Sequence, residues 1–212
     1  MTIKLCDMTV TQFVDTVASD APAPGGGSVA ALAGSIGAAL TAMVGNLTQG
    51  RKKYADYADF AAQVEQKGND LRRRLLDVMD RDTEAFMLVS DAFSLPKATD
   101  EEKAARSAAI QAGLKACTKT PMEMMELCAE TAQLAFDFAE NGFNDSSASD
   151  LGVAFLSLSA AIRGAWLNVL INISSIKDQT FAEEYRQKGQ ALLDRTLPLC
   201  DAGYEKVLGM VQ

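Results

Sequence analysis

The stretch Ala21-Pro22-Ala23-Pro24-Gly25-Gly26-Gly27-Ser28, together with residues 29–48, decides the fold. The prolines end any helix that precedes them, and the glycines permit a tight turn into the next one. Residues 29–48 are almost entirely small and apolar, with alanine, glycine or threonine recurring every four positions. This pattern predicts a central helix that is buried and that other helix backbones approach closely.

The same segment is about long enough to cross a bilayer. We nevertheless expect no membrane span, because Ser35, Thr41 and Asn46 interrupt the segment and because alanine and glycine are only weakly hydrophobic. A membrane-associated helical protein stays as a minor alternative that depends on this segment alone.

Helix signals continue to the end of the chain. No stretch alternates polar and apolar residues as a half-buried strand does, so we expect an all-α helical bundle, one domain over residues 1–212. Capping pairs, prolines and glycines predict the helix boundaries. The first expected helix starts at Thr9. The others cover residues 29–48, 54–94 (one helix, or two joined near Gly68), 99–119, 120–141, 150–175 and 180 onward. We expect Pro198 to kink or split the last of them.

Composition excludes several kinds of chemistry. The 212 residues include no histidine, which rules out His-based acid–base catalysis, Ser-His and Cys-His pairs, and His-ligated metals. A net charge of -8 argues against non-specific binding to nucleic acid or anionic membranes, and an anionic substrate would need a local basic patch. The four cysteines form no CxxC motif, so we expect reduced thiols in a cytoplasmic protein.

Two segments near the predicted central helix could contact a ligand. Gly25, Gly26, Gly27 and Ser28 lead into a helix N-terminus, whose free N–H groups and positive dipole end suit a carboxylate or phosphate, although a tight turn without a ligand fits as well. Arg51 and Lys52 follow the helix. They either compensate its C-terminal dipole or form a clamp for an acidic substrate tail.

Carboxylates and amides supply further candidates. Asp82 lies on a helix where exposure is the default, but in a pocket its pKa would rise towards that of a useful base. Asn144 and Asp150 flank a polar loop, where capping is the simple explanation. Asn168 and Asn172, four residues apart on an apolar helix, indicate either helix–helix hydrogen bonds or a pocket wall.

Taken in order, these motifs resemble the cyclodeaminase/cyclohydrolase family, which includes the C-terminal domain of formiminotransferase-cyclodeaminase and stand-alone bacterial methenyltetrahydrofolate cyclohydrolases. The resemblance covers nearly the entire chain. It is carried by Pro22-Ala23-Pro24-Gly25-Gly26-Gly27-Ser28, Gly50-Arg51-Lys52-Lys53-Tyr54, Asp82-Thr83-Glu84-Ala85-Phe86, Leu95-Pro96-Lys97-Ala98-Thr99-Asp100-Glu101-Glu102-Lys103, Asn144 with Ser149-Asp150, and Asn168-Val169-Leu170-Ile171-Asn172.

The resemblance implies an all-α homodimer with a folate substrate and with no metal or redox cofactor. A cyclohydrolase opens 5,10-methenyltetrahydrofolate to 10-formyltetrahydrofolate, whereas a cyclodeaminase closes 5-formiminotetrahydrofolate with loss of ammonia. The free-standing length and the stretch at residues 50–54 favour hydrolysis, with ammonia release as the alternative. A folate-binding or structural protein without activity is the non-enzymatic alternative.

We assign roles at these positions from chemistry. Asp150 first, and Asp82 second, would stabilise the cationic methenyl carbon and deprotonate water. Lys52 would assist proton transfer or, with Arg51, hold the glutamate tail. Residues 25–28 would offer N–H groups to the pterin or to a carboxylate, and Asn144, Asn168 and Asn172 would bond the pterin edge.

Overall fold

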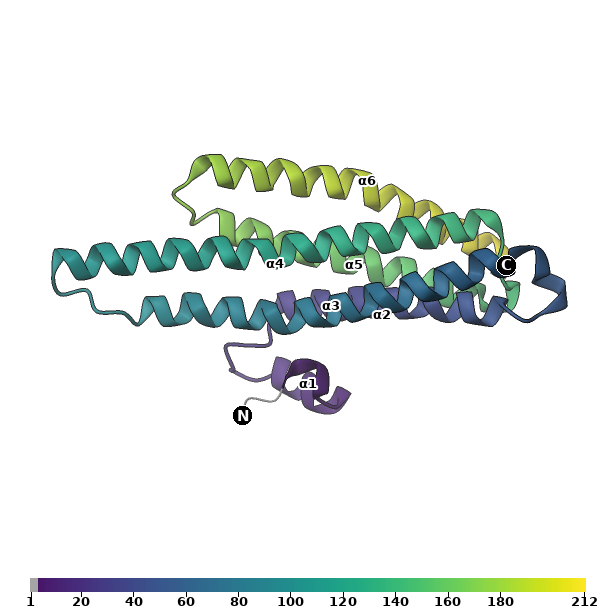
Figure 1. Cartoon of the computed structure of the whole chain (residues 1–212), viewed down its shortest axis with the longest axis horizontal. Coiled ribbons are helices and arrows are strands. Elements are labelled where there is room, and N and C mark those ends of the chain that lie inside the picture. The colour runs from purple at the N-terminus through teal and green to yellow at the C-terminus, as the bar shows by residue number, and fades with distance from the viewer. Residues whose placement is uncertain (1–3) are drawn as a thin grey trace.

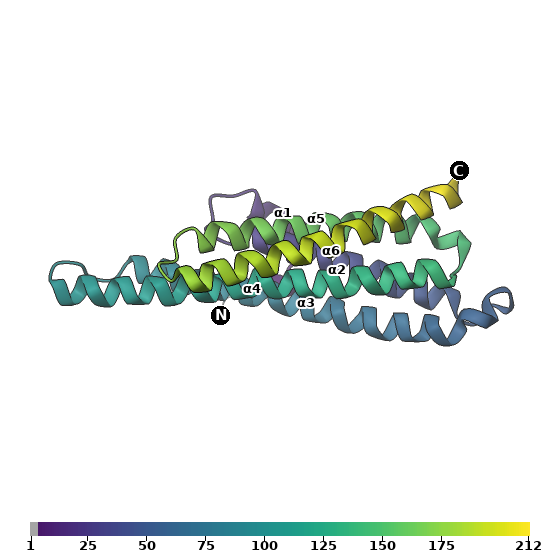
Figure 2. The same cartoon turned by 90° about the horizontal axis from the view of Figure 1, so that it is seen from above.

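The long helices of the chain lie roughly along one direction and pack side by side, as two perpendicular views show (Figure 1 and Figure 2). The computed structural model describes residues 4–212, and within that range every regular element is a helix, which confirms the all-α bundle. The elements are η1 (Leu5–Asp7), α1 (Val10–Val17), α2 (Gly26–Thr48), η2 (Lys52–Tyr57), α3 (Ala58–Phe93), α4 (Asp100–Asn141), η3 (Asp145–Ser147), α5 (Ala148–Ile173) and α6 (Gln179–Val211).

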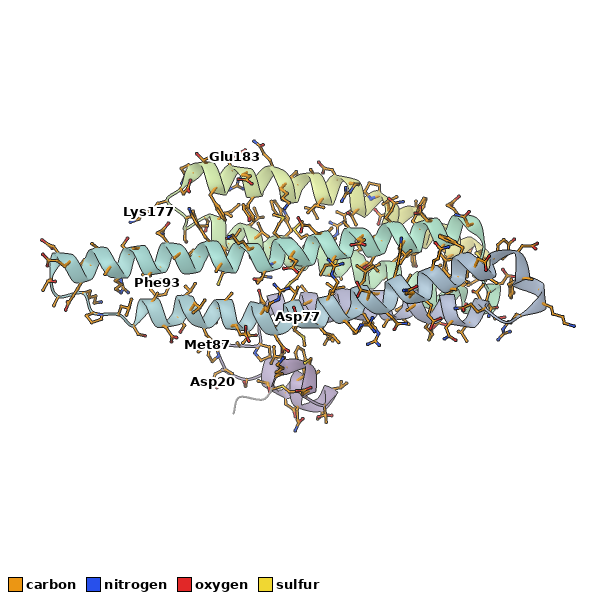
Figure 3. All side chains as sticks on the ribbon, viewed as in Figure 1. Asp20, Asp77, Met87, Phe93, Lys177 and Glu183 are labelled. Atoms are coloured by element: carbon orange, nitrogen blue, oxygen red, sulfur yellow. The ribbon has the colours of Figure 1, made fainter. Side chains whose placement is uncertain are left out.

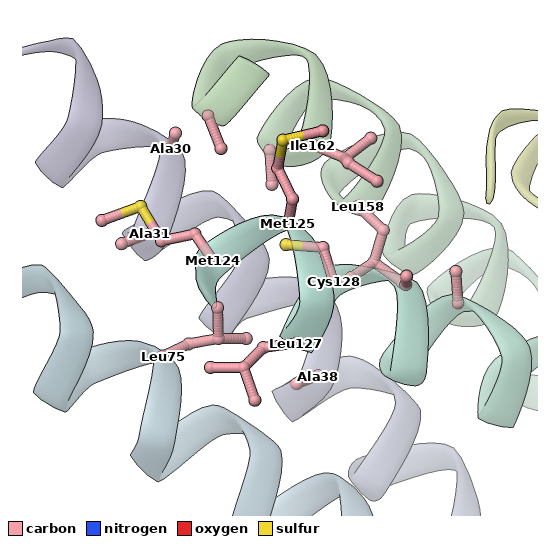
Figure 4. Packing of buried hydrophobic residues seen from close by; sticks show 14 of the residues in the cluster. Ala30, Ala31, Ala38, Leu75, Met124, Met125, Leu127, Cys128, Leu158 and Ile162 are labelled. Atoms are coloured by element: carbon pink, nitrogen blue, oxygen red, sulfur yellow. The ribbon is translucent and has the colours of Figure 1, made fainter. Parts of the chain in front are cut away.

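The Ala/Gly-rich helix α2 packs against α3, α5 and, over a shorter stretch, α4. Its alanines face the larger apolar side chains of these neighbours, so small residues on one helix accommodate large ones on the others (Figure 4). The contacting side chains include Leu75 of α3, Met124, Met125 and Leu127 of α4, and Leu158 and Ile162 of α5.

Glycines let the backbones of α2 and α3 touch. A Cβ added to Gly45 would lie 2.8 Å from the carbonyl oxygen of Ala61 and 2.9 Å from the amide nitrogen of Glu65. On the opposing helix, a Cβ on Gly68 would lie 2.9 Å from the Cβ of Ala42. The two helices therefore approach too closely for any side chain at these positions, and α3 runs through Gly68 without a break.

Residues 100–141 form one helix, so the expected division at residues 119–120 is wrong. Pro121 lacks the N–H that would bond the carbonyl of Cys117 one turn earlier. The side chain of Asn172, on α5, donates to that carbonyl oxygen at 2.7 Å and replaces the missing bond. The expected split at Pro198 is also wrong, because α6 continues from Gln179 to Val211.

Helix caps follow the sequence where the signal is local. Thr9 with Gln12 and Thr99 with Glu102 form capping boxes at helix starts expected from the sequence, and Gly142 ends α4 with a φ of 111°. Three other helices start earlier than expected. Helix α2 starts at Gly26 and is capped by Gly25, α6 starts at Gln179 and is capped by Asp178, and α5 starts at Ala148, which places Asp150 in its first turn rather than at its cap.

Helices α2 and α5 leave one exposed apolar surface, which we call the α2–α5 face. It carries Val29, Ile36, Met43 and Leu47 of α2 and Val153, Leu156, Leu167 and Ile171 of α5. Helix α2 has no charged residue, and α5 has only Asp150 and Arg163. By length and composition both segments could cross a membrane, but α2 is mostly buried by its neighbours. A surface this apolar is typical of a contact with another molecule.

The close α2–α3 contact predicts the effect of a single methyl group. Gly45→Ala should lower the free energy of unfolding by about 1–3 kcal/mol, because the overlap with the α3 backbone outweighs the better helix propensity of alanine. Gly209→Ala is the matched control, since no atom of the part of the chain that the structure describes lies within 4 Å of a Cβ there. Urea unfolding measures both, and equal stability of the two variants would contradict the contact.

Candidate active site

A cavity of about 490 Å³ lies where the N-terminus of α2 meets α3, α4 and the end of α5. Its wall is mainly polar near the N-terminus of α2 and mainly apolar at the other end, where Gln111 and Ser175 are also polar. The polar part comprises Gly25, Gly26, Gly27, Ser28, Asp82, Thr83, Cys117, Asn168 and Asn172, and the apolar part includes Phe86, Phe93, Ile110, Leu114 and Ile171. Seven of these polar residues, Asp82 included, are among the sequence-predicted site residues.

Asp82 is the half-buried carboxylate of this cavity. It lies against Gly27, where a side chain would overlap the carboxylate, so the glycine makes room for the acid. Thr120 donates its hydroxyl to Oδ1 of Asp82 at 3.1 Å. Burial raises the pKa of Asp82 above its ordinary value of 3.8, and the Thr120 hydrogen bond opposes this only in part.

The N-terminus of α2 opens into the same cavity. No side chain of the described residues 4–212 caps it, and the first amide to bond within the turn is that of Val29, which donates to the carbonyl oxygen of Gly25 at 3.0 Å. The preceding N–H groups have no partner inside the helix. Glycine at positions 25–27 leaves them open to a small molecule, and the helix dipole makes this end partly positive.

Asn168 and Asn172 line the cavity and also support the helices. Each uses its side-chain NH2 within the protein: Asn168 donates to the carbonyl oxygen of Gly164 at 2.9 Å, and Asn172 to those of Asn168 and Cys117. Within residues 4–212, no hydrogen bond reaches the Oδ1 atom of either residue. Both amides are therefore held in place with an acceptor oxygen available for a ligand.

The remaining predicted residues lie elsewhere in the chain. Arg51, Lys52, Asn144 and Asp150 are at the opposite end of α2, and a helix of its length spans about 35 Å. Asn144 bonds that end directly: its amide nitrogen donates to Oγ1 of Thr48 and its Nδ2 to the carbonyl oxygen of Leu47. One copy of the chain therefore does not bring Asp82 together with Lys52 or Asp150.

Several residues of the site were missed by sequence reasoning, one behind the cavity wall and the others lining it. Thr120 resembles a helix cap in sequence, yet it lies inside α4 and bonds Asp82. Phe86 and Phe93 lie four and eleven positions after Asp82, a spacing that puts all three on one side of α3. That spacing is a signal that could have been found; the contribution of Gln111 and Cys117 from α4 has no comparable signal.

Comparison with known proteins identifies the family. Residues 9–191 match the model of the formiminotransferase-cyclodeaminase family. The chain belongs to this family. It is 45% identical over 203 residues to a protein of Methylorubrum extorquens named methenyltetrahydrofolate cyclohydrolase, covering 96% of this chain and 97% of that one.

Two further relatives are named as cyclodeaminases. The formimidoyltransferase-cyclodeaminase of Rattus norvegicus is 35% identical over 190 residues, which are 90% of this chain but 35% of the rat protein. The chain thus spans about a third of that relative. The crystal structure of formiminotetrahydrofolate cyclodeaminase from Thermotoga maritima has a TM-score of 0.81 and 28% identity, and the match covers 98% of this chain and 97% of that one.

The environment of Asp82 predicts a pH-dependent effect on stability. Because its pKa is raised in the folded state, wild-type stability should fall as pH rises through that pKa. Asp82→Asn should therefore be at least as stable as wild type at pH 8, with an advantage that shrinks towards pH 4. Urea unfolding across this range is the measurement, and Asp91→Asn, at an exposed position of α3, controls for the lost charge. A loss of stability in Asp82→Asn that is equal at every pH would contradict the assignment.

Proposed function

We propose that this chain hydrolyses 5,10-methenyltetrahydrofolate to 10-formyltetrahydrofolate. The observation that carries the proposal is a half-buried carboxylate with a raised pKa, set beside an uncapped helix N-terminus in a cavity lined by two asparagines. Membership of the family and a cyclohydrolase relative of matching length support the substrate and the reaction.

Asp82 is the residue that we place at the reacting carbon. The methenyl carbon belongs to a cationic amidinium-like group, which a carboxylate stabilises while it accepts a proton from the attacking water. The bond from the tetrahedral carbon to N5 then breaks: the carbinol oxygen becomes the formyl C=O on N10, its proton passes to N5, and the proton that Asp82 took from water is released to solvent. Proton transfer suffices for these steps, and we propose that no metal or redox cofactor takes part.

The other cavity groups hold the pteridine. The amide oxygens of Asn168 and Asn172 accept hydrogen bonds from its N–H groups. The N–H groups at the start of α2, at Gly26, Gly27 and Ser28, donate to its carbonyl oxygen or to a substrate carboxylate. The sequence favoured Asp150 over Asp82 for proton transfer; the cavity reverses this preference, because Asp82 lines it and Asp150 does not.

We also propose that a second copy of the chain covers the α2–α5 face. Ile171 belongs both to this face and to the cavity wall, so the cavity opens beside the contact surface. The two copies would be related by a two-fold axis that lies in the plane of the face. If this axis is perpendicular to α2 and passes close to its middle, near Gly37, the two α2 helices are antiparallel. That arrangement puts the partner's Arg51, the partner's Lys52 and the partner's Asp150 near the cavity of the first copy.

This arrangement gives the second cluster of predicted residues a role. The partner's Lys52 supplies the cation that a proton relay needs, whereas Asn144 is buried against α2 of its own copy and takes no part in the shared site. A protein that stays soluble without detergent and elutes as a dimer fits this proposal. Solubility only in detergent would favour a membrane contact instead. The free cysteines fit our proposal of a cytoplasmic location.

Cyclodeaminase activity is the second candidate, because the rat and Thermotoga maritima relatives carry that name. A paired assay separates the two reactions. The protein should accelerate the decay of the chromophore of 5,10-methenyltetrahydrofolate. With 5-formiminotetrahydrofolate, the protein should produce no methenyl chromophore. Appearance of the chromophore with release of ammonia would favour the cyclodeaminase, and no effect on either folate would indicate a binding protein.

Replacing the proposed base predicts a large kinetic effect. Asp82→Asn should lower turnover by roughly two to four orders of magnitude, because the amide cannot accept the proton. In the wild type, turnover above the uncatalysed rate should fall as pH drops through the raised pKa of Asp82. Asp91→Asn should keep wild-type turnover, and a folded Asp82→Asn protein with near-normal turnover would remove Asp82 from the mechanism.

The shared site predicts complementation between two defective chains. Asp82→Asn and Lys52→Ala should each be impaired as homodimers. After co-refolding in equal amounts, half of the dimers are mixed and each contains one intact site, so about a quarter of wild-type activity should return. Activity equal to the average of the two parents, or a Lys52→Ala chain with normal turnover, would contradict a site shared between copies.

A further inference from the structure

The apolar end of the cavity leads to two cations, Arg106 of α4 and Lys177 between α5 and α6. We infer that Arg106 and Lys177 bind the glutamate-tail carboxylates of the substrate, an inference that rests on the proposed function. Figure 3 shows Phe93 and Lys177 on either side of α4 at the same end of the bundle. The cavity wall between them is formed by Ile110 and Gln111.

Arg106 is held at the rim of the cavity by Phe93. Its Nη2 and Nε atoms donate to the carbonyl oxygen of Phe93 at 3.0 and 3.3 Å. Its guanidinium carbon lies 5.6 Å from the centre of the Phe93 ring. These neutral partners fix the side chain beside a residue of the cavity wall and leave its positive charge uncompensated.

Lys177 is held from the other side by cavity residues of α4. Its backbone nitrogen donates to Oε1 of Gln111 at 2.7 Å, while Nε2 of Gln111 donates to the carbonyl oxygen of Ser175 at 3.0 Å. The ammonium group donates to the hydroxyl of Ser107 at 2.9 Å. Gln111 therefore anchors the turn between α5 and α6 to the cavity and keeps Lys177 at its edge.

The partners of these cations distinguish them from their neighbours. Lys103 pairs with Asp100 at 2.9 Å, and Lys115 pairs with Asp178 at 2.7 Å. Among residues 4–212, neither Arg106 nor Lys177 forms an ion pair with a carboxylate. In a chain of net charge -8, two such cations at one rim provide the local basic patch that an anionic substrate needs.

The length of the cavity fits a substrate that is polar at both ends. From Asp82 to Phe93 the chain advances eleven residues along α3, about 16 Å. With the one-carbon bridge at Asp82, the benzoyl ring contacts Phe86, Phe93 and Ile110, and the tail emerges between the two cations. Arg51 and Lys52 of the same copy lie at the far end of α2 and cannot take this role.

Substrates with one and with three glutamates test the inference. In wild type the triglutamate should have the lower KM. In the double variant Arg106→Ala/Lys177→Ala, the KM for the triglutamate should rise about tenfold at low salt, with a smaller rise for the monoglutamate and little change in kcat. Lys103→Ala, which removes a paired cation at the same end, should leave both KM values unchanged.

An unchanged ratio of the two KM values in the double variant would overturn the inference. If the ratio is lost in Arg51→Ala/Lys52→Ala instead, the tail lies on the partner's Arg51 and the inference is equally overturned. Equilibrium binding of the two folates is measured in parallel. The wild type could bind the triglutamate more tightly than the monoglutamate and yet turn over neither, with the double variant losing this difference in binding. That result would refute the proposed function and leave the tail site standing.

Discussion

The close approach of α2 to its neighbours is the constraint on which the rest of the structure depends. Small residues along α2 let α3 and α5 pack almost backbone to backbone, and a methyl group at Gly45 would already collide with α3. Such packing fixes the position of α2 relative to α3 and α5. Because α2 has no charged residue, its polar chemistry comes mainly from the backbone groups at its ends. Its exposed apolar side is the part that can contact a partner.

The start of α2 carries the chemistry in this account. Glycine at position 27 admits the Asp82 carboxylate beside a set of unpaired N–H groups, and burial keeps that carboxylate a stronger base than a solvated one. The same burial disfavours the charged form and therefore costs stability. Thr120 limits this cost by donating a hydrogen bond to Asp82. Asn172 removes a separate cost, because it bonds the carbonyl oxygen that Pro121 leaves without a partner.

Sequence reasoning succeeded where a signal is local. The helical class follows from residue periodicity, and the capping boxes at Thr9 and Thr99 each depend on two residues three positions apart. It failed at Pro121, because the bond that keeps α4 continuous comes from Asn172 on another helix. A window of neighbouring residues contains no information about that contact.

The candidate site was predicted in part for a related reason. Asp82, Asn168, Asn172 and residues 25–28 do share one cavity, but Arg51, Lys52, Asn144 and Asp150 lie at the other end of α2. A sequence states the order of motifs along the chain and not which ends of antiparallel helices meet. Lys177 bonds Ser107, the residue that follows Arg106, and this contact brings the two cations to the same end of α4. They are about seventy positions apart in the sequence and belong to no motif.

A crystal structure of the Asp82→Asn chain with 5,10-methenyltetrahydrofolate would show directly whether Asp82 faces the reacting carbon. We expect the one-carbon bridge within about 4 Å of the residue 82 side chain, the pteridine against the N-terminus of α2, and side chains from a second copy at the cavity mouth. A pteridine bound beside Lys52 and Asp150 of its own copy, with the Asp82 cavity empty, would contradict this expectation.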